Sequence, residues 1–284
     1  MDSVLVLGGT GKTGTEVAKA LSSRSDVKVR VASRHPIPAS RANVLAVRFD
    51  WNDEATWPAA IADANAVYLV KPKTADPART VAAFLAYCRD VDRLVLLSEI
   101  AADKQDATAD ELRVEKVVED SPCSWTILRP NWFMQNFATP SFFGDAIRNQ
   151  HAVTIPTAGQ PLSFVDTRDI AAVATAALIE EGHAKKHYTL TGPEALTFSE
   201  ALGRIATVAG YAVSHVDPQL DDFLAKSEVG GASRNAIAYY RRVYSNIANG
   251  FDSVVTSDVE KVTGQKARNF SDFVSEHRTS WSTN

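Results

Sequence analysis

Short apolar runs separated by amphipathic segments dominate the first 130 residues of the chain. Six runs are predicted as strands: Val4–Leu7, Val27–Ala32, Val44–Phe49, Ala66–Val70, Leu94–Leu97 and Trp125–Leu128. Helical spacing lies between them over Asp53–Ala62, Pro77–Arg89 and Asp106–Glu119. Runs such as Val4–Leu7 lack polar alternation, as in a parallel sheet that helices cover on both faces. The alternation of strand and helix predicts an α/β fold of Rossmann type, with a doubly wound parallel sheet.

The pattern changes after residue 131. Short predicted strands alternate there with helices, over Val153–Ile155, Leu162–Val165 and His187–Thr191 for strands and Arg168–Glu180, Phe198–Ala209 and Ala232–Ala248 for helices. A chain of 284 residues suits one large α/β domain with an added lobe. We therefore expect a core over residues 1–130 and a smaller α/β lobe over residues 131–284, which interleaves with the core and mainly binds the substrate.

Glycines at three-residue spacing follow the first predicted strand. Gly8 allows a tight turn, Gly11 lets the backbone approach a phosphate, and Gly14 lets the next helix pack closely. The N-terminus of that helix would face the phosphates. This context predicts a dinucleotide-binding turn. A mononucleotide P-loop, suggested by Gly11-Lys12-Thr13, requires a further glycine at position 6, which is Val6.

The end of the second predicted strand indicates which dinucleotide binds. Folds that prefer NAD place Asp or Glu there to bind the ribose 2′-hydroxyl, but this chain has Ser33-Arg34-His35. The planar guanidinium of Arg34 suits a 2′-phosphate, with help from Ser33 and Lys12. The alternative is that Arg34 is only a solvated loop charge. We expect NADP(H) as the cofactor.

Composition excludes several other classes. The formal net charge is −4 and the chain has no basic run, so nucleic acid is not an expected partner. No apolar stretch approaches membrane-spanning length and no charged leader precedes the first strand, so a cytoplasmic protein is expected. Cys88 and Cys123 predict neither a disulfide framework nor a metal site. His183 and His187 fall on a predicted loop and strand, which does not favour metal binding.

The usual proton donor of short-chain dehydrogenases is missing. These enzymes use a Tyr-x-x-x-Lys pair on the helix after the fifth strand, but the chain has no tyrosine between Tyr87 and Tyr188. Two kinds of function remain. One is an enzyme whose acceptor needs hydride but little acid, such as an iminium, a quinone or an activated enone. The other is a regulatory protein that senses the dinucleotide without turnover.

Several segments together resemble a known family. They are the glycine turn, Ser33-Arg34, Arg48–Trp51, Leu94–Ser98 and above all Thr126–Phe137. The chain is similar over nearly its whole length to the NmrA-like group of atypical short-chain dehydrogenases, and within it to the ergot alkaloid reductases of the festuclavine synthase and agroclavine dehydrogenase type. The resemblance implies an NADPH-dependent reductase of an iminium. The group also contains quinone reductases and a redox-sensing transcriptional regulator.

The resemblance also implies roles for individual residues. The pyrophosphate would be bound by Gly8, Thr10, Gly11, Lys12, Thr13 and Gly14. Asp50 and Trp51 would contact adenine, although Trp51 is equally explained as a core residue. Lys71 and Pro72 would lie beside the ribose and nicotinamide, although Lys71 is also explained as a surface lysine. Pro130 and Asn131 would lie near the carboxamide.

The expected chemistry involves two residues after the fifth strand. Ser98 is predicted as a hydrogen-bond donor beside nicotinamide, although a hydroxyl that only ends a strand is common. Glu99 is the acid predicted to stabilise an iminium charge. A small aromatic or conjugated substrate is expected to contact Trp132, Phe133, Asn136 and Phe142, where ring faces favour a cation by roughly 0.5–2 kcal/mol. For the neighbouring Phe137 we prefer core packing. The preferred function is hydride delivery to a planar conjugated acceptor, an imine or iminium first.

Overall fold

A computed structural model describes residues 2–38 and 41–282 of the chain. In this part of the chain, a seven-stranded sheet has the order β3-β2-β1-β4-β5-β6-β8, and every neighbouring pair is parallel. The strands are β1 (Asp2–Val6), β2 (Val27–Ser33), β3 (Val44–Arg48), β4 (Ala66–Val70), β5 (Arg93–Leu97), β6 (Ser124–Pro130) and β8 (Lys186–Leu190). The predicted doubly wound parallel sheet is confirmed.

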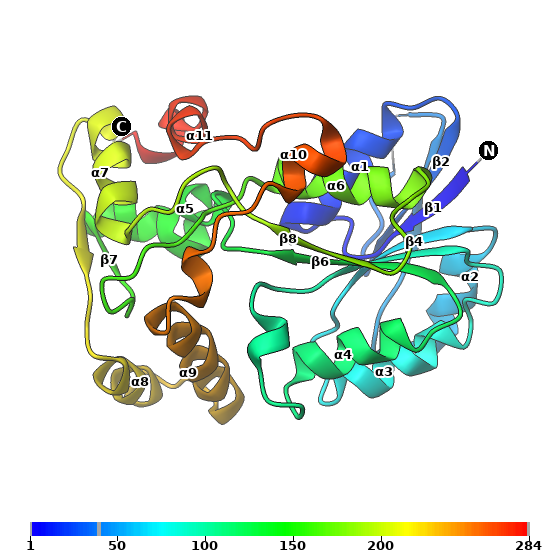
Figure 1. Ribbon diagram of the computed structural model, residues 1–284, viewed down its shortest axis with the longest axis horizontal. Helices are drawn as coiled ribbons and strands as arrows, with labels where there is room; N and C mark the ends of the chain where they lie inside the picture. Colours follow the sequence, from blue (N-terminus) through cyan, green and yellow to red (C-terminus); the bar gives the residue numbers. More distant parts are fainter. Residues whose placement is uncertain (1, 39–40, 283–284) are drawn as a thin grey trace. The chain divides into compact units, whose positions relative to one another are not determined.

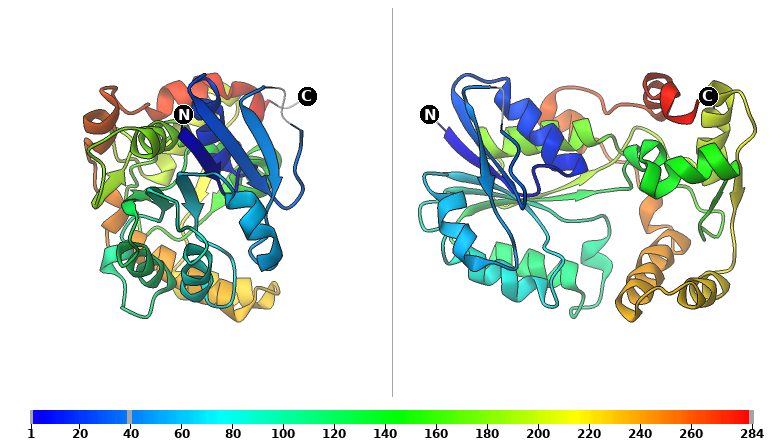
Figure 2. Two further views of the ribbon diagram at one scale, coloured as in Figure 1. Left: turned by 90° about the vertical axis from the view of Figure 1, so that its right-hand side faces the viewer. Right: turned by 180° about the vertical axis from the view of Figure 1, so that it is seen from behind.

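Helices cover both faces of this sheet. Helices α1 (Lys12–Ser22) and α6 (Thr167–Ile179) lie on one face, and α3 (Pro77–Leu85) and α4 (Asp110–Glu119) lie on the other (Figures 1 and 2). Leu5 and Leu7 of the β1 segment pack with Val81 and Val114 in one core cluster, whereas Val4 and Val6 are buried outside that cluster. Burial of both faces explains why the strands read as continuous apolar runs.

The order of strands changes direction between β1 and β4. The chain first adds β2 and β3 on one side of β1, and then β4, β5, β6 and β8 on the other. Ligands of such sheets bind beyond the carboxyl ends of the strands at this switch point. The residues that follow β1, β2, β4, β5 and β6 therefore lie at the edge where a ligand is expected.

Several predicted elements differ from the observed ones. The segment Asp53–Ala62 divides into a 3₁₀ turn η1 (Glu54–Thr56) and the short helix α2 (Trp57–Ile61), with Pro58 in its first turn. Leu162–Val165 forms isolated bridges, Leu162 to Leu196 and Val165 to Phe133, and not a strand. The apolar run satisfied the strand pattern, but within residues 2–38 and 41–282 no neighbouring strand pairs along it.

Helix α4 begins four residues later than predicted. The carboxylate of Asp106 accepts hydrogen bonds from the backbone N–H of Thr108 at 2.9 Å and from its hydroxyl at 2.7 Å. Such an Asx turn competes with helical bonds, so the helix starts at Asp110. Helix α3 ends at Leu85 and not at Arg89, because the N–H groups of Tyr87 and Cys88 bond only three residues back.

The chain divides into two compact units. The first comprises the chain up to Pro130, Thr167–Leu190 and Asp258–Gln265; the second comprises Asn131–Asp166, Thr191–Ser257 and the chain from Lys266. The predicted ranges 1–130 and 131–284 also include residues 1, 39, 40, 283 and 284, which lie outside the described residues. The functional assignment of the two units stays a prediction.

The remaining elements belong to one unit each. The first unit contains η2 (Ala102–Lys104) and α10 (Asp258–Thr263). The second contains α5 (Gln135–Ala138), two π-helical turns η3 (Pro140–Gly144) and η4 (Ala146–Gln150), β7 (Ala152–Thr154), α7 (Phe198–Ala209), β9 (Ser214–Val216), α8 (Leu220–Val229), α9 (Arg234–Ala248), η5 (Phe251–Ser253), α11 (Phe270–Glu276) and η6 (Arg278–Trp281). Its core is aromatic and includes Phe137, Phe164, Phe198, Phe270 and Trp281.

The glycine of helix α1 should tolerate substitution worse than a glycine of helix α7. A Cβ at Gly14 would lie 2.2 Å from the carbonyl oxygen of Gly8, whereas a Cβ at Gly203 meets no atom within 4 Å. We expect Gly14→Ala to lower the free energy of unfolding by about 1–3 kcal/mol through overpacking, and the matched control Gly203→Ala to raise it by about 0.5–1 kcal/mol through helix propensity. Denaturant unfolding of both variants checks this, and equal effects would contradict the close approach at Gly14.

Candidate functional site

The turn after β1 requires glycine at several positions. Gly8 has φ +64°, in the left-handed region that other residues rarely adopt. A Cβ at Gly9 would lie 2.4 Å from Cγ1 of Val31, so this residue abuts β2. A Cβ at Gly11 meets only the carbonyl oxygen of Gly8, at 3.2 Å, within 4 Å. The backbone of Gly11 is therefore open on its outer side, as a close approach by phosphate requires.

Helix α1 presents a positive N-terminus at this turn. Its N-cap is Gly11, which supplies no side-chain cap, and its first turn holds no acidic residue. Lys12 occupies the first helical position, and burial lowers the pKa of its ammonium below the usual range. The hydroxyl of Thr15 donates to the carbonyl of Gly9 at 3.2 Å and braces the turn. These features fit a bound pyrophosphate, which uses helix N–H groups and dipole.

The residue after β2, Arg34, is a cation on the surface. Arg34 is exposed and forms no ion pair with any residue that the structure describes. Arg30 of the same strand, by contrast, bonds the carbonyls of Ala59 and Ala60 and the carboxylate of Asp63. Ser33 lies half-buried at the end of β2. Arg34 is thus available for a 2′-phosphate, and this role stays a prediction.

The residues after β3 have structural contacts of their own. One carboxylate oxygen of Asp50 accepts from the backbone N–H of Asn52 at 3.0 Å. Trp51 is half-buried and lies edge-on to Phe49 and Phe84, with ring centroids 4.9 and 5.3 Å apart. These contacts support the core interpretation of Trp51. Contact of either residue with adenine stays a prediction.

Polar residues that follow β4 and β5 or lie near the end of β6 contact two glutamates of helix α4. The ammonium of Lys71 forms an ion pair with Glu111. The hydroxyl of Ser98 donates to Oε1 of Glu115 at 2.5 Å. Arg129 binds both carboxylate oxygens of Glu115, through Nε at 3.0 Å and Nη2 at 2.6 Å. Glu111 and Glu115 are separated by one helical turn, so one face of α4 engages three strand ends.

The pair Glu115–Arg129 is deeply buried. Glu115 is 1% exposed, and its bidentate bonds to Arg129 satisfy both oxygens. Burial lowers the pKa of the guanidinium, but the hydrogen bonds and charge of Glu115, with the charge of Asp103, outweigh burial and leave that pKa raised. Such an ion pair is costly to break, because one charge would then be buried without a partner.

This geometry corrects one expectation about Ser98. A serine hydroxyl has one proton, and an ionised carboxylate only accepts. Since Ser98 donates its proton to Glu115, it is not oriented to donate to a ligand, as the sequence suggested. Lys71 is likewise not a bare surface lysine, because its ammonium is paired with the buried Glu111. Pro72 is buried beside it, and Glu99 is half-buried after Ser98.

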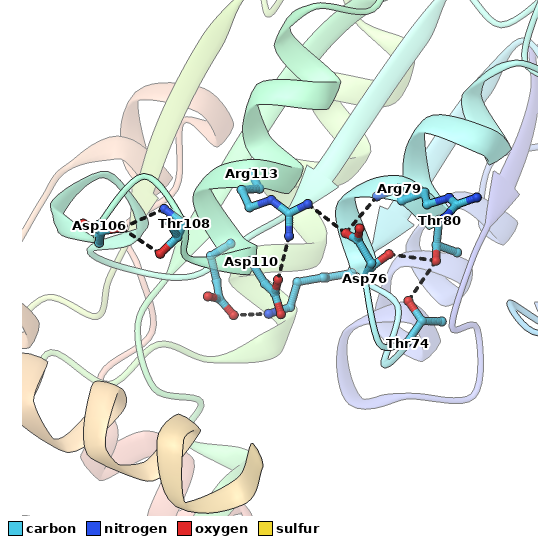
Figure 3. A network of polar contacts seen from close by, with 10 residues as sticks. Thr74, Asp76, Arg79, Thr80, Asp106, Thr108, Asp110 and Arg113 are labelled. Carbon is cyan, nitrogen blue, oxygen red and sulfur yellow. Dashed lines mark hydrogen bonds and ion pairs between the residues drawn. The ribbon is translucent and has the colours of Figure 1, made fainter. Parts of the chain in front are cut away.

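Helix α4 is also held at its N-terminal end. Asp76 caps α3 by accepting from the backbone N–H of Arg79 at 3.2 Å, and it accepts from Arg113 of α4 at 3.0 Å (Figure 3). Arg113 also contacts Asp110 at 3.4 Å. The loop after β4 and the start of α4 are thereby joined. The network around Lys71, Ser98 and Arg129 is therefore supported from both helices on this face.

In the second unit, Asn131 is buried and hydrogen-bonded to other groups of the protein. It is 2% exposed; its amide nitrogen donates to the hydroxyl of Ser163 and to the carbonyl of Asp252, both at 2.7 Å. Its amide oxygen accepts from the backbone N–H of Trp132 at 2.8 Å. Both amide protons are thus used within the unit, which favours positioning of Trp132 over donation to a cofactor. Pro130, the last residue of β6, is buried, and its carbonyl accepts from the N–H of Ile100.

The second unit also gathers aromatic side chains around Trp132. The indole lies nearly parallel to Phe143 and at 25° to Tyr244, with ring centroids 6.4 Å apart in each case. Phe142 lies edge-on to it and is 49% exposed. Burial, then the neighbouring tyrosines, raise the pKa of Tyr244. This cluster presents ring surface, as a flat ligand requires.

Other predicted substrate residues differ in exposure. Phe133 is half-buried and bridges to Val165, whereas Asn136 is 7% exposed and Phe137 is fully buried. The preference for Phe137 as a core residue agrees with its burial. A separate hollow of about 540 Å³ lies between α3 and α4 and is lined by Ala78, Ala82, Leu112, Val117 and neighbouring charged residues. None of the predicted site residues lines it.

Sequence reasoning missed three residues of this region, Gly9, Glu111 and Glu115, and gave Arg129 no role beyond its place after a predicted strand. A signal existed for two of them, because Glu111 and Glu115 are spaced to share one face of a helix. Nothing in the pattern distinguished them from solvated glutamates.

In the described part of the chain, no helix is both long and apolar enough to cross a membrane.

Comparisons with known proteins agree with this fold. A family model described as NAD(P)H-binding matches residues 8–181. The uncharacterized oxidoreductase YesF of Bacillus subtilis is 32% identical, with 99% of this chain and 96% of that protein covered. An agroclavine dehydrogenase of Claviceps fusiformis is 29% identical, with 98% of each covered.

Solved structures extend the comparison. The NADPH-dependent quinone oxidoreductase QOR2 of Escherichia coli, complexed with NADPH, has a TM-score of 0.80 at 19% identity and covers 97% of this chain and 99% of its own. The negative transcriptional regulator NmrA has a TM-score of 0.73 at 12% identity, with 97% and 95% covered. The expected resemblance is confirmed: this chain belongs to the NAD(P)H-binding family, as an oxidoreductase whose fold is similar to that of NmrA.

Proposed function

We propose that this protein is an NADPH-dependent reductase that delivers hydride to a planar conjugated acceptor, with an imine or iminium preferred. One observation carries the proposal. Where a short-chain dehydrogenase would have its tyrosine and lysine, helix α4 has the buried carboxylates Glu111 and Glu115. Glu111 is paired with Lys71 and Glu115 with Arg129, so both carboxylates bind donors that could otherwise stabilise negative charge on an acceptor.

The chemistry of the acceptor follows from these pairings. Reduction of a ketone places negative charge on oxygen, which enzymes stabilise with aimed donors or a positioned acid. The proton of Ser98 is given to Glu115, and Lys71 is paired with Glu111. An iminium needs neither group, because hydride addition converts it directly to a neutral amine. Bound NADPH would supply the hydride.

Two further observations support a flat substrate and the phosphorylated cofactor. Phe142 is exposed and lies edge-on to Trp132 in the second unit. The names of the relatives include an agroclavine dehydrogenase and a quinone oxidoreductase. Arg34 stands where folds that prefer NAD have a carboxylate. A quinone or enone is the second class of acceptor that we consider.

The competing function is dinucleotide sensing without turnover. It is favoured by the missing tyrosine-lysine pair and by the likeness to NmrA, which is described as a transcriptional regulator. The two functions make opposite predictions for cofactor consumption.

The first test of the proposed function is NADPH oxidation with a cyclic iminium, a quinone, an enone and a ketone. We expect steady turnover that is fastest with the iminium and slowest with the ketone. Absorbance of NADPH measures the rate, and an assay without acceptor is the control. Tight NADPH binding with no acceptor consumed would favour the sensing function. Fastest turnover of the ketone would contradict the engagement of Lys71 and Ser98 by the two glutamates.

The second test concerns the cofactor phosphate. Arg34→Glu should weaken NADPH by about tenfold or more, because charged hydrogen bonds contribute about 1.5–3 kcal/mol, and should affect NADH much less. Arg24→Glu is a matched control, since Arg24 is exposed and paired with Asp26. Titration of each cofactor measures the dissociation constants. Equal weakening of NADPH and NADH would remove Arg34 from recognition of the 2′-phosphate.

The third test concerns the acid after β5. Glu99→Gln removes one negative charge and should lower kcat/KM for the iminium by about fivefold or more, if the charge contributes about 1 kcal/mol. NADPH affinity should change little. Glu54→Gln, at an exposed glutamate of η1, is the control. Unchanged turnover and substrate affinity in Glu99→Gln would exclude Glu99 from the mechanism.

A further inference from the structure

The hydroxyl of Ser98 has a fixed direction in this structure. Its single proton lies toward Oε1 of Glu115, at an oxygen-to-oxygen distance of 2.5 Å. That carboxylate also receives two N–H groups of Arg129. Arginine only donates and an ionised carboxylate only accepts. Among these three residues, therefore, Ser98 can only donate to Glu115. Toward any further partner, its oxygen can only accept a hydrogen bond through its lone pairs.

The surroundings oppose reversal of this direction. Glu115 is 1% exposed, so water cannot replace the proton of Ser98 if the hydroxyl rotates away. Oε1 of Glu115 would then keep only the hydrogen bond from Nε of Arg129 and would lose the shorter one from Ser98. Ser98, in contrast, is half-buried and follows β5 at the carboxyl edge of the sheet. The proton of Ser98 is therefore bound to the protein, whereas the residue itself is only partly covered.

We propose that Ser98 accepts a hydrogen bond from an N–H group of a bound ligand, and that Glu115 and Arg129 are positioning residues that set this direction. The inference rests on the proposed function, because it specifies the ligand of the same site. Two ligands carry such a group: the carboxamide NH₂ of nicotinamide, and an iminium with a proton on nitrogen. A carbonyl oxygen, which needs a donor, is disfavoured at this position.

The first experiment measures cofactor binding without turnover. Dissociation constants are measured for NADPH and for its reduced 3-acetylpyridine analogue, in which a methyl group replaces the NH₂. If Ser98 accepts from the carboxamide, the wild-type protein should bind NADPH about 3- to 10-fold more tightly than the analogue. Ser98→Ala should remove this difference, and Ser98→Thr, which keeps the hydroxyl, should retain it.

The second experiment examines the substrate as the source of the N–H group. A cyclic iminium with a proton on nitrogen is compared with its N-methyl counterpart by kcat/KM. If Ser98 accepts from the substrate, the wild-type protein should prefer the N–H form by about 3- to 10-fold, and Ser98→Ala should abolish the preference. If the preference for the N–H form in either experiment is lost in Ser98→Ala, the proposal is supported. The experiment that shows this loss identifies whether the cofactor or the substrate donates to Ser98. Equal ratios in wild type and Ser98→Ala in both experiments would overturn it.

The positioning role is tested on helix α4. Glu115→Gln can turn an amide N–H toward Ser98, so the N–H preference should be lost. When Glu115→Gln is added to Ser98→Ala, the ratio between the two ligands should not change further. If Glu115 acted through its charge and not through Ser98, the ratio would still change in this double variant, and the positioning role would be overturned. Asp120→Asn is the control at the end of α4, because Asp120 is exposed and instead contacts Lys116 at 2.8 Å. Ratios of two ligands are insensitive to a general loss of folded protein.

The result is separable from the proposed function. If no acceptor is reduced, the proposed function fails, but the ratio for NADPH and its analogue remains measurable. If the iminium is reduced and neither ratio depends on Ser98, the proposed function stands and this inference fails.

Discussion

The buried carboxylate of Glu115 is the interaction on which the chemistry of this site depends. Removing a carboxylate from water costs several kcal/mol, and the cost is offset only by close, well-directed partners. Arg129 and Ser98 are those partners. Ser98 follows β5 and Arg129 lies near the end of β6. The same bonds therefore attach α4 to the carboxyl edge of the sheet. Stability and the direction of the Ser98 hydroxyl thus have one common origin.

The sheet brings this network to the same edge as the glycine turn. Parallel strands place all their carboxyl ends on one side, and the change of strand order between β1 and β4 separates the turn and Arg34 from Lys71 and Ser98. One end of the edge is therefore positive and suits phosphates, whereas the other contains carboxylates matched with cations. A cofactor that carries phosphates and delivers hydride is consistent with this division of charge.

Much of the fold was predictable from the sequence because its signals are local. Apolar runs, glycine spacing and the lack of a tyrosine between Tyr87 and Tyr188 are all visible along the chain. Strand pairing over Leu162–Val165 was predicted wrongly, because pairing depends on a neighbour that the pattern does not specify. The start of α4 was missed because the Asx turn of Asp106 competes with helical hydrogen bonds.

The candidate site was less predictable for a related reason. Ser98 was found by its place after a strand, but its role as donor or acceptor depends on Glu115, which lies 17 positions later in the chain. Glu111 and Glu115 have the spacing of ordinary solvated glutamates, and only tertiary packing reveals that they are buried. Asn131 was placed correctly after β6, yet its amide protons are used by Ser163 and Asp252.

The central claim is that hydride transfer here needs no proton from the protein. The most direct measurement is kcat/KM for a preformed iminium in H₂O and in D₂O, with NADPH and with NADPH deuterated at the transferred position. The account predicts an isotope effect from the deuterated cofactor and none from the solvent. A solvent isotope effect that accompanies the cofactor effect would contradict it, because a protein acid would then transfer a proton in the same step.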